Sequence, residues 1–104
     1  MNPILLLKAW HDQHREVSSD QGIDQTFSID AGGQSARLDA DSGSALGRAT
    51  VWATGMCDIE VIDFEDGRLL MFLHVEATTE EALHSGLAEM IRWMRPGSRL
   101  HPHA

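Results

Sequence analysis

The residues best suited to chemistry in this sequence include a pair of histidines near the N-terminus. His11 and His14 lie three positions apart, with Asp12 and Glu16 beside them. On a helix this spacing places both imidazoles on one side, where they could bind a transition metal weakly. A solvated helix face is the favoured interpretation, so we predict no bound metal and no cofactor.

A second candidate for chemistry is the combination of Asp58 and His74, which are predicted cross-strand neighbours. Such a pair could act as an acid–base dyad, but it lacks a nucleophile and a third orienting group, so a polar cross-strand contact is favoured. Cys57 is predicted to face inward as a small hydrophobe, which argues against a catalytic thiol. The sequence contains no P-loop, GxGxxG, CxxC or HExxH motif, and we predict that the protein is not an enzyme.

The charge of the chain is unevenly placed. The net charge is −8, and residues 20–66 account for all of it, with ten acidic and two basic side chains. This field repels nucleic acid and anionic lipid and attracts a basic partner, although ordinary solubility is an alternative explanation. No apolar run approaches the ~20 residues that span a bilayer, and the single cysteine excludes an intramolecular disulfide. We therefore expect a cytoplasmic protein.

Helical periodicity occurs at both ends of the chain. Residues 3–19 and 79–95 are predicted helices, and Thr78 with Glu81 offers a capping box at the start of the second. The apolar face of the first helix is predicted to hold Leu6, Trp10 and Val17, flanked by Leu7 and His14. That of the second is predicted to hold Leu83, Leu87, Met90, Ile91 and Met94.

Between the helices the apolar residues alternate, which is typical of strands with one buried face. The predicted strands are residues 26–31, 36–40, 47–53, 57–64 and 68–76. Short glycine-containing loops join most of them as hairpins. We predict an α+β fold in which an N-terminal helix, a five-stranded antiparallel meander and a C-terminal helix form a two-layer sandwich. Residues 1–95 are predicted to be one domain and residues 96–104 a mobile tail.

The hairpin loops also predict the strand registers. Phe27 is expected opposite Leu38, and Ala49 opposite Ile59, so that apolar residues share one face. The other face then mixes large apolar groups with acids, as a protein interface does. The expected apolar members are Trp52, Met56, Phe72 and an Ile62–Leu70 pair. Cover by a helix or by the 41–46 loop is the alternative.

The predicted partner-binding residues follow from this face and from the loop beside it. They are Asp39, Asp41, Arg48, Trp52, Asp58, Glu60, Phe72 and His74. The sequence leaves open whether a partner docks on the sheet face or on a 39–46 loop.

The second half of the chain contains the runs GRATVW (residues 47–52) and GMCDIEV (residues 55–61), an acidic turn after them, and Glu80-Glu81 in the closing helix. This pattern resembles TriTu-type immunity proteins, mainly over residues 47–94. Members of that family are encoded beside Rhs-type polymorphic toxins. The resemblance implies an immunity protein that binds and neutralises a cognate toxin associated with type VI secretion, an ADP-ribosyltransferase, by occluding its active site. The alternative is a secretion chaperone or adaptor that binds an effector without inhibiting it.

Overall fold

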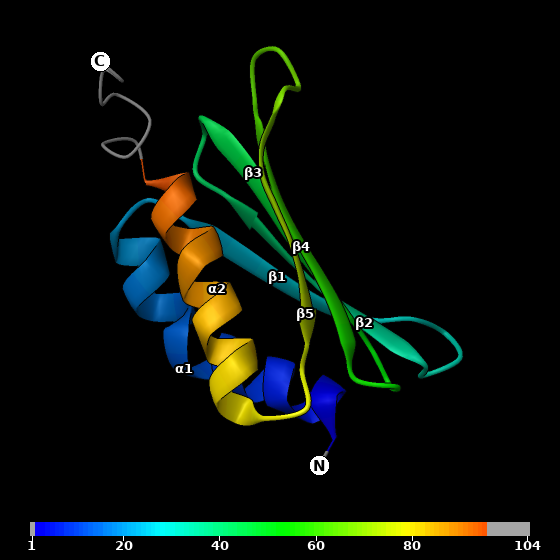
Figure 1. Ribbon diagram of the computed structural model, residues 1–104. Coiled ribbons are helices and arrows are strands. Elements are labelled where there is room, and N and C mark those ends of the chain that lie inside the picture. The colour runs from blue at the N-terminus through cyan, green and yellow to red at the C-terminus, as the bar shows by residue number, and fades with distance from the viewer. Residues whose placement is uncertain (1, 96–104) are drawn as a thin grey trace.

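The computed structural model describes residues 2–95, and these form two helices and five strands in the predicted order (Figure 1). The elements are α1 (Pro3–Asp20), β1 (Asp24–Ile29), β2 (Ser35–Asp41), β3 (Ala45–Trp52), β4 (Met56–Asp63), β5 (Leu69–Glu76) and α2 (Glu80–Met94). The predicted elements are confirmed, with boundaries that differ by a few residues at most. The predicted tail at 96–104 lies outside the described residues, and the single domain over 1–95 stays a prediction.

The strands form one antiparallel sheet in the order β1-β2-β3-β4-β5. Phe27 pairs with Leu38 and Ala49 pairs with Ile59, as the hairpin loops predict. Gly55 and Gly67 have φ values of +100° and +71°, the left-handed conformation that ends each bulged turn and that glycine adopts without steric cost. Local turn chemistry therefore predicts the register of the sheet, apart from the irregularity in β4 and β5 described next.

The prediction that Ile62 lies opposite Leu70 is wrong. The β4–β5 pairing shifts between Val61 and Ile62, and Ile62 lies opposite Leu69. A bulge of this kind sets an extra residue against one position of the partner strand. Leu70 consequently packs against the core, and Leu69 is exposed.

Both helices pack on the same face of the sheet, which confirms the two-layer α+β sandwich. α1 contacts β1, β2 and β3, and α2 contacts β3, β4 and β5 (Figure 1). The core between the layers includes Leu7, Leu38, Ile59, Leu87 and Met90, which are fully buried. The opposite face of the sheet carries neither helix.

α1 is rotated relative to the predicted apolar face. Trp10 and Leu7 are buried, but Val17 is 57% exposed, and His11 and Ser18 are buried in its stead. The His11 ring shares a 2.8 Å hydrogen bond with Oε1 of Gln25, and the Ser18 hydroxyl donates to the carbonyl of Ile23. Polar side chains satisfied in this way can be buried, which a search for apolar residues alone does not detect.

The start of α2 also differs from the prediction. Thr79 rather than Thr78 is the N-cap, and its hydroxyl accepts a hydrogen bond from the backbone N–H of Ala82. The third helical residue is therefore Ala82, which cannot complete a capping box, and the predicted box from Thr78 to Glu81 is wrong. Leu83, Leu87, Met90 and Met94 are buried as predicted, and Ile91 is partly buried.

Cys57 faces the core as predicted, and burial, with a smaller contribution from the nearby Asp58 charge, raises the pKa of its thiol to about 12. We expect no reaction with a thiol reagent at pH 8 until the protein unfolds.

The Cys57 thiol ionises at lower pH in the unfolded protein than in the folded one. The stability that this group contributes is therefore complete below about pH 9 and is lost as pH rises toward 12. Denaturation of wild type and Cys57→Ala across this pH range measures the free energy of unfolding. The variant should lack the fall in that free energy with rising pH that Cys57 causes.

Candidate protein-binding surface

All eight predicted partner-binding residues lie on the face of the sheet opposite the helices, here called the outer sheet face. The inward positions of β2, β3 and β4 are buried, so the alternate side chains point outward. Rows of paired residues cross this face: Asp39 pairs with Arg48, Arg48 with Glu60, and Glu60 with Phe72. The predicted residues therefore form one surface.

The predicted choice between the sheet face and a 39–46 loop does not arise in the structure. Asp39 and Asp41 belong to β2, and Leu46 belongs to β3, where it pairs with Asp41. Only residues 42–44 lie between these two strands. Most of the 39–46 segment is strand, because the alternation that marks β2 and β3 runs almost to the turn at residues 42–44.

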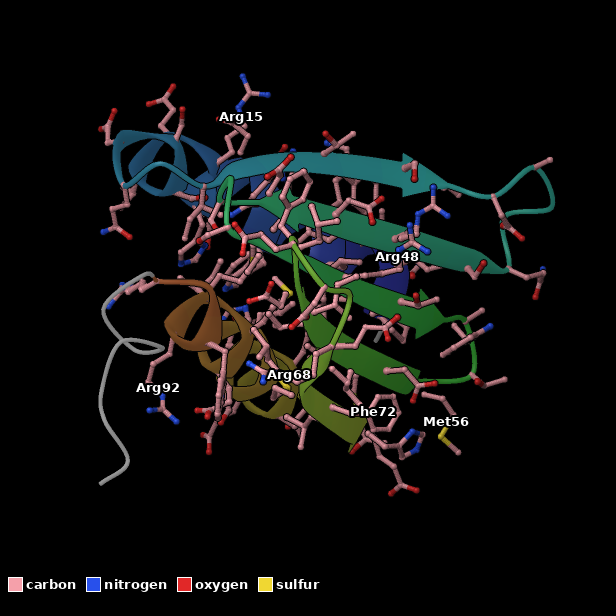
Figure 2. The ribbon with its side chains drawn as sticks, turned by 90° about the horizontal axis from the view of Figure 1, so that it is seen from above. Arg15, Arg48, Met56, Arg68, Phe72 and Arg92 are labelled. Atoms are coloured by element: carbon pink, nitrogen blue, oxygen red, sulfur yellow. The ribbon has the colours of Figure 1, made fainter. Side chains whose placement is uncertain are left out.

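Large apolar side chains are exposed on the outer sheet face. Trp52 is 37% exposed, Met56 42% and Phe72 55%. Neither a helix nor the 42–44 turn covers these groups, so the alternative of a covered face is wrong. Figure 2 shows Met56 and Phe72 projecting on the side of the molecule away from α2. Exposed apolar groups set among acids are typical of a surface that binds another protein.

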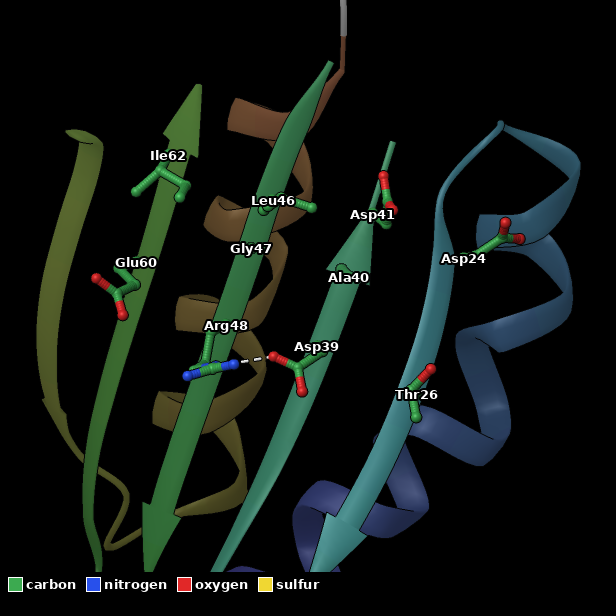
Figure 3. A pocket seen from close by; sticks show the side chains of 10 residues that line it. All are labelled: Asp24, Thr26, Asp39, Ala40, Asp41, Leu46, Gly47, Arg48, Glu60 and Ile62. Carbon is green, nitrogen blue, oxygen red and sulfur yellow. Dashed lines mark hydrogen bonds and ion pairs between the residues drawn. The ribbon is translucent and has the colours of Figure 1, made fainter. Parts of the chain in front are cut away.

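Two arginines on this face share one carboxylate. Asp39 accepts hydrogen bonds from Nε of Arg37 at 2.9 Å and from Nε of Arg48 at 2.8 Å. Arg48 thus turns toward β2, although Glu60 lies opposite it on β4 (Figure 3). Within residues 2–95 Glu60 makes no ion pair, and it is half-buried. Glu60 is therefore available to a cation on a partner.

A hollow of about 560 Å³ lies in the outer sheet face beside Arg48 (Figure 3). Its walls come from β1 to β4, and its charged side chains are four acids and one base. The lining residues are Asp24, Thr26, Asp39, Ala40, Asp41, Leu46, Gly47, Arg48, Glu60 and Ile62. This hollow has the shape and charge to receive a basic side chain from another protein.

Asp58 and His74 form the predicted cross-strand contact. Nδ1 of His74 lies 2.6 Å from Oδ1 of Asp58, and both side chains are at least 40% exposed. Thr50 lies on the far side of Asp58, so the order across the sheet is hydroxyl, acid, imidazole. A histidine that activates a nucleophile must contact it directly. This row places the acid between them, and it favours a surface contact over a catalytic group.

The N-terminal histidines are engaged within the protein. His11 is 8% exposed, so the interpretation of a solvated face is wrong for this residue. Nδ1 of His14 lies 2.8 Å from the Trp10 carbonyl oxygen, and its ring stacks on Trp10 at 4.2 Å between ring centroids. Among residues 2–95 no group of three potential metal ligands converges.

No helix within residues 2–95 has the length and apolar character to cross a membrane.

Arg37, Leu46 and Leu69 are among the members of the outer sheet face that the sequence interpretation missed. Arg37 follows from the alternation of β2, in which it lies between the buried residues Ala36 and Leu38 and therefore points outward. Leu46 follows from extending the alternation of β3 by one residue toward the N-terminus. Leu69 had no signal in the sequence, because the bulge that exposes it depends on packing.

Comparison with known proteins adds a family to this geometry. The family model described as Immunity protein TriTu matches residues 6–93. The match begins in α1 and ends in α2, so the likeness also includes the first half of the chain, beyond the residues 47–94 that mainly carry the resemblance in the sequence. No curated protein and no solved structure matches the chain at a significant level.

Proposed function

The chain belongs to the TriTu family of immunity proteins, and we propose that it neutralises its cognate toxin by covering the toxin's active site with the outer sheet face. An immunity protein has to bind tightly and to leave no access for substrate. A rigid sheet that presents exposed aromatic groups and acids suits both requirements, because apolar anchors slow dissociation and charge speeds encounter.

The observation that carries the proposal is the combination of apolar and acidic groups on one uncovered face. Trp52 and Phe72 are exposed, and Glu60 and the other acids of the hollow lie on the same face of the sheet. Asp39 is already occupied by Arg37 and Arg48, so it holds the surface in shape rather than contacting a partner first. The binding charge therefore comes from acids such as Glu60 and Asp41.

The toxin proposed for this site is an ADP-ribosyltransferase domain of an Rhs-type protein delivered by type VI secretion, and the encounter takes place in the cytoplasm. A domain that binds the phosphates of a nucleotide cofactor needs positive charge in its cleft. The hollow lined by Asp24, Asp41 and Glu60 is complementary to such a cleft. Acids that enter the cleft would compete with the cofactor's phosphates for the same basic side chains.

Co-expression with the toxin encoded beside this protein tests the proposal. We expect the two proteins to purify together, the cells to survive, and the purified complex to lack NAD⁺-consuming activity. A secretion chaperone or adaptor would yield a complex that keeps or regains the effector's activity. Absence of binding together with absence of protection would exclude an immunity role toward that toxin.

Reversing one charge in the hollow should slow association. Glu60→Lys is expected to lower the association rate constant about 10-fold at low ionic strength, because it places a cation where a basic partner docks. The effect should shrink as salt is added, since screening weakens the attraction between exposed charges. Stopped-flow association at two salt concentrations measures both.

The matched control is Glu16→Lys, an equal change of net charge on the exposed surface of α1. It should slow association much less than Glu60→Lys. Equal effects of the two variants would mean that overall charge, rather than the outer sheet face, steers the toxin.

A further inference from the structure

β5 forms a free edge of the sheet. Within residues 2–95 it pairs only with β4, and Figure 1 shows it at the near edge of the sheet with no ribbon in front of it. The backbone N–H of Ala77, just beyond β5, donates to the Gly55 carbonyl on the β4 side at 2.6 Å. Because N–H and C=O directions alternate along an antiparallel strand, those of Phe72, His74 and Glu76 point away from β4. The Glu76 carbonyl accepts a hydrogen bond from the Thr78 N–H at 2.8 Å. Within residues 2–95 the other backbone groups of this row are open donors and acceptors.

In the part of the chain that the structure describes, this edge lacks the features that usually block strand addition. Proteins protect edge strands with lysine, proline or a covering element. β5 has the sequence LLMFLHVE, which contains no lysine, arginine or proline. Its bulge lies at the Leu69 end, and the row from Phe72 to Glu76 is regularly paired to β4. The six residues from Met71 to Glu76 can therefore accept another strand.

The flank beside this edge is apolar and incompletely buried. Leu73 and Val75 point toward the helices but are only partly buried, since no further strand lies beside them. α2 passes close above them at Gly86, where a Cβ would meet Val75 Cγ2 at 3.2 Å. Trp93 lies two helical turns further along the same side of α2 and is also partly buried. An added strand would cover this apolar flank.

We propose that an extended segment of the toxin adds to the free edge of β5 as a sixth strand. The inference rests on the proposed toxin-binding function and gives its docking mode. Backbone hydrogen bonds to Phe72, to His74 and to the N–H of Glu76 supply the pairing, and the two faces of the added strand supply specificity. Its inward residues are apolar and cover Leu73 and Val75. Its outward residues include lysine or arginine and extend the outer sheet face.

Charge favours a basic segment of the toxin over a second copy of this chain. The outward side chains next to the edge include Glu76, with Asp58 and Glu60 one strand further in. Lysine or arginine on the added strand would lie beside these acids. Two copies of the chain, each with a net charge of −8, would instead repel one another. The edge is also continuous with the outer sheet face through Phe72 and His74.

His74→Pro tests the role of the backbone. Proline removes the N–H that points to the free edge and leaves the β4–β5 hydrogen bonds in place, and it is tolerated at such edge positions. His74→Ala also removes the imidazole but keeps the N–H. We expect His74→Pro to weaken toxin binding at least about 10-fold more than His74→Ala does, because an unpaired carbonyl is left buried in the toxin strand. Equal affinities of the two variants would overturn the proposal.

Amide hydrogen exchange of the wild-type protein provides a measurement that requires no substitution. On adding toxin, the amides of Phe72, His74 and Glu76 should gain protection, whereas those of Gln25, Phe27 and Ile29 on the β1 edge should not. An inhibited complex without protection at the β5 edge would overturn strand addition and leave the proposed function standing. Protection in the free protein, together with a dimer by sedimentation, would assign the edge to a second copy. Absence of any complex would instead count against the proposed function.

Discussion

Phe72→Ala is expected to weaken toxin binding by at least about 2 kcal/mol, roughly 30-fold in Kd. Phe72 is 55% exposed and lies on the outer sheet face at the free edge of β5. Its ring is positioned to be buried by a partner on either side, and fully desolvated aromatic anchors carry much of the binding energy of an interface. Isothermal titration calorimetry with the catalytically inactive toxin measures the change.

The chain offers a close control in Phe64, which is 58% exposed but lies in the turn between β4 and β5. Phe64→Ala removes the same group at the same exposure away from the proposed surface. It should change the affinity by less than about 0.5 kcal/mol, and neither variant should lower the free energy of unfolding by much. A larger loss for Phe64→Ala than for Phe72→Ala would move the interface to the β4–β5 turn.

Gly86→Val is expected to destabilise the fold by at least about 2 kcal/mol, in the range of overpacked cores. Gly86 lies in the middle of α2, where glycine normally weakens a helix, and its backbone passes directly over the sheet. A Cβ at this position would lie 2.8 Å from Ile59 Cδ1 and 3.2 Å from Val75 Cγ2. The added methyl groups of valine would push α2 away from β4 and β5. Urea denaturation measures the loss.

Ser85→Val is the matched control, because it places the same β-branched residue at the neighbouring, exposed position of α2. It should cost less than about 1 kcal/mol, since only helix propensity changes. Similar losses for the two variants would show that valine weakens the helix itself and that the close approach at Gly86 tolerates a side chain. A displaced α2 should also weaken toxin binding through the adjacent β5.

Local patterns were sufficient to predict the sheet and most of the outer sheet face. The loops that end at Gly55 and Gly67 each predict one register, and alternation with a period of two then assigns the side chains to a face, except at the bulge beside Leu69 and Leu70. These two features predict Arg48, Glu60 and Phe72 in one row, and the structure confirms that row. The prediction succeeded because a hairpin is formed by residues that are close together in the sequence.

Other features depended on contacts between distant segments and could be established only in three dimensions. The burial of His11 requires Gln25 on β1, and the exposure of Leu69 requires a bulge that lets Leu70 reach the core. Periodicity also could not show that both helices cover the same face. This arrangement leaves the acids and aromatic groups of the other face open to a partner, together with the free edge of β5. Packing decides these features because a helix or an edge acquires its partners from the whole chain, whereas alternation and turns record only the nearest residues.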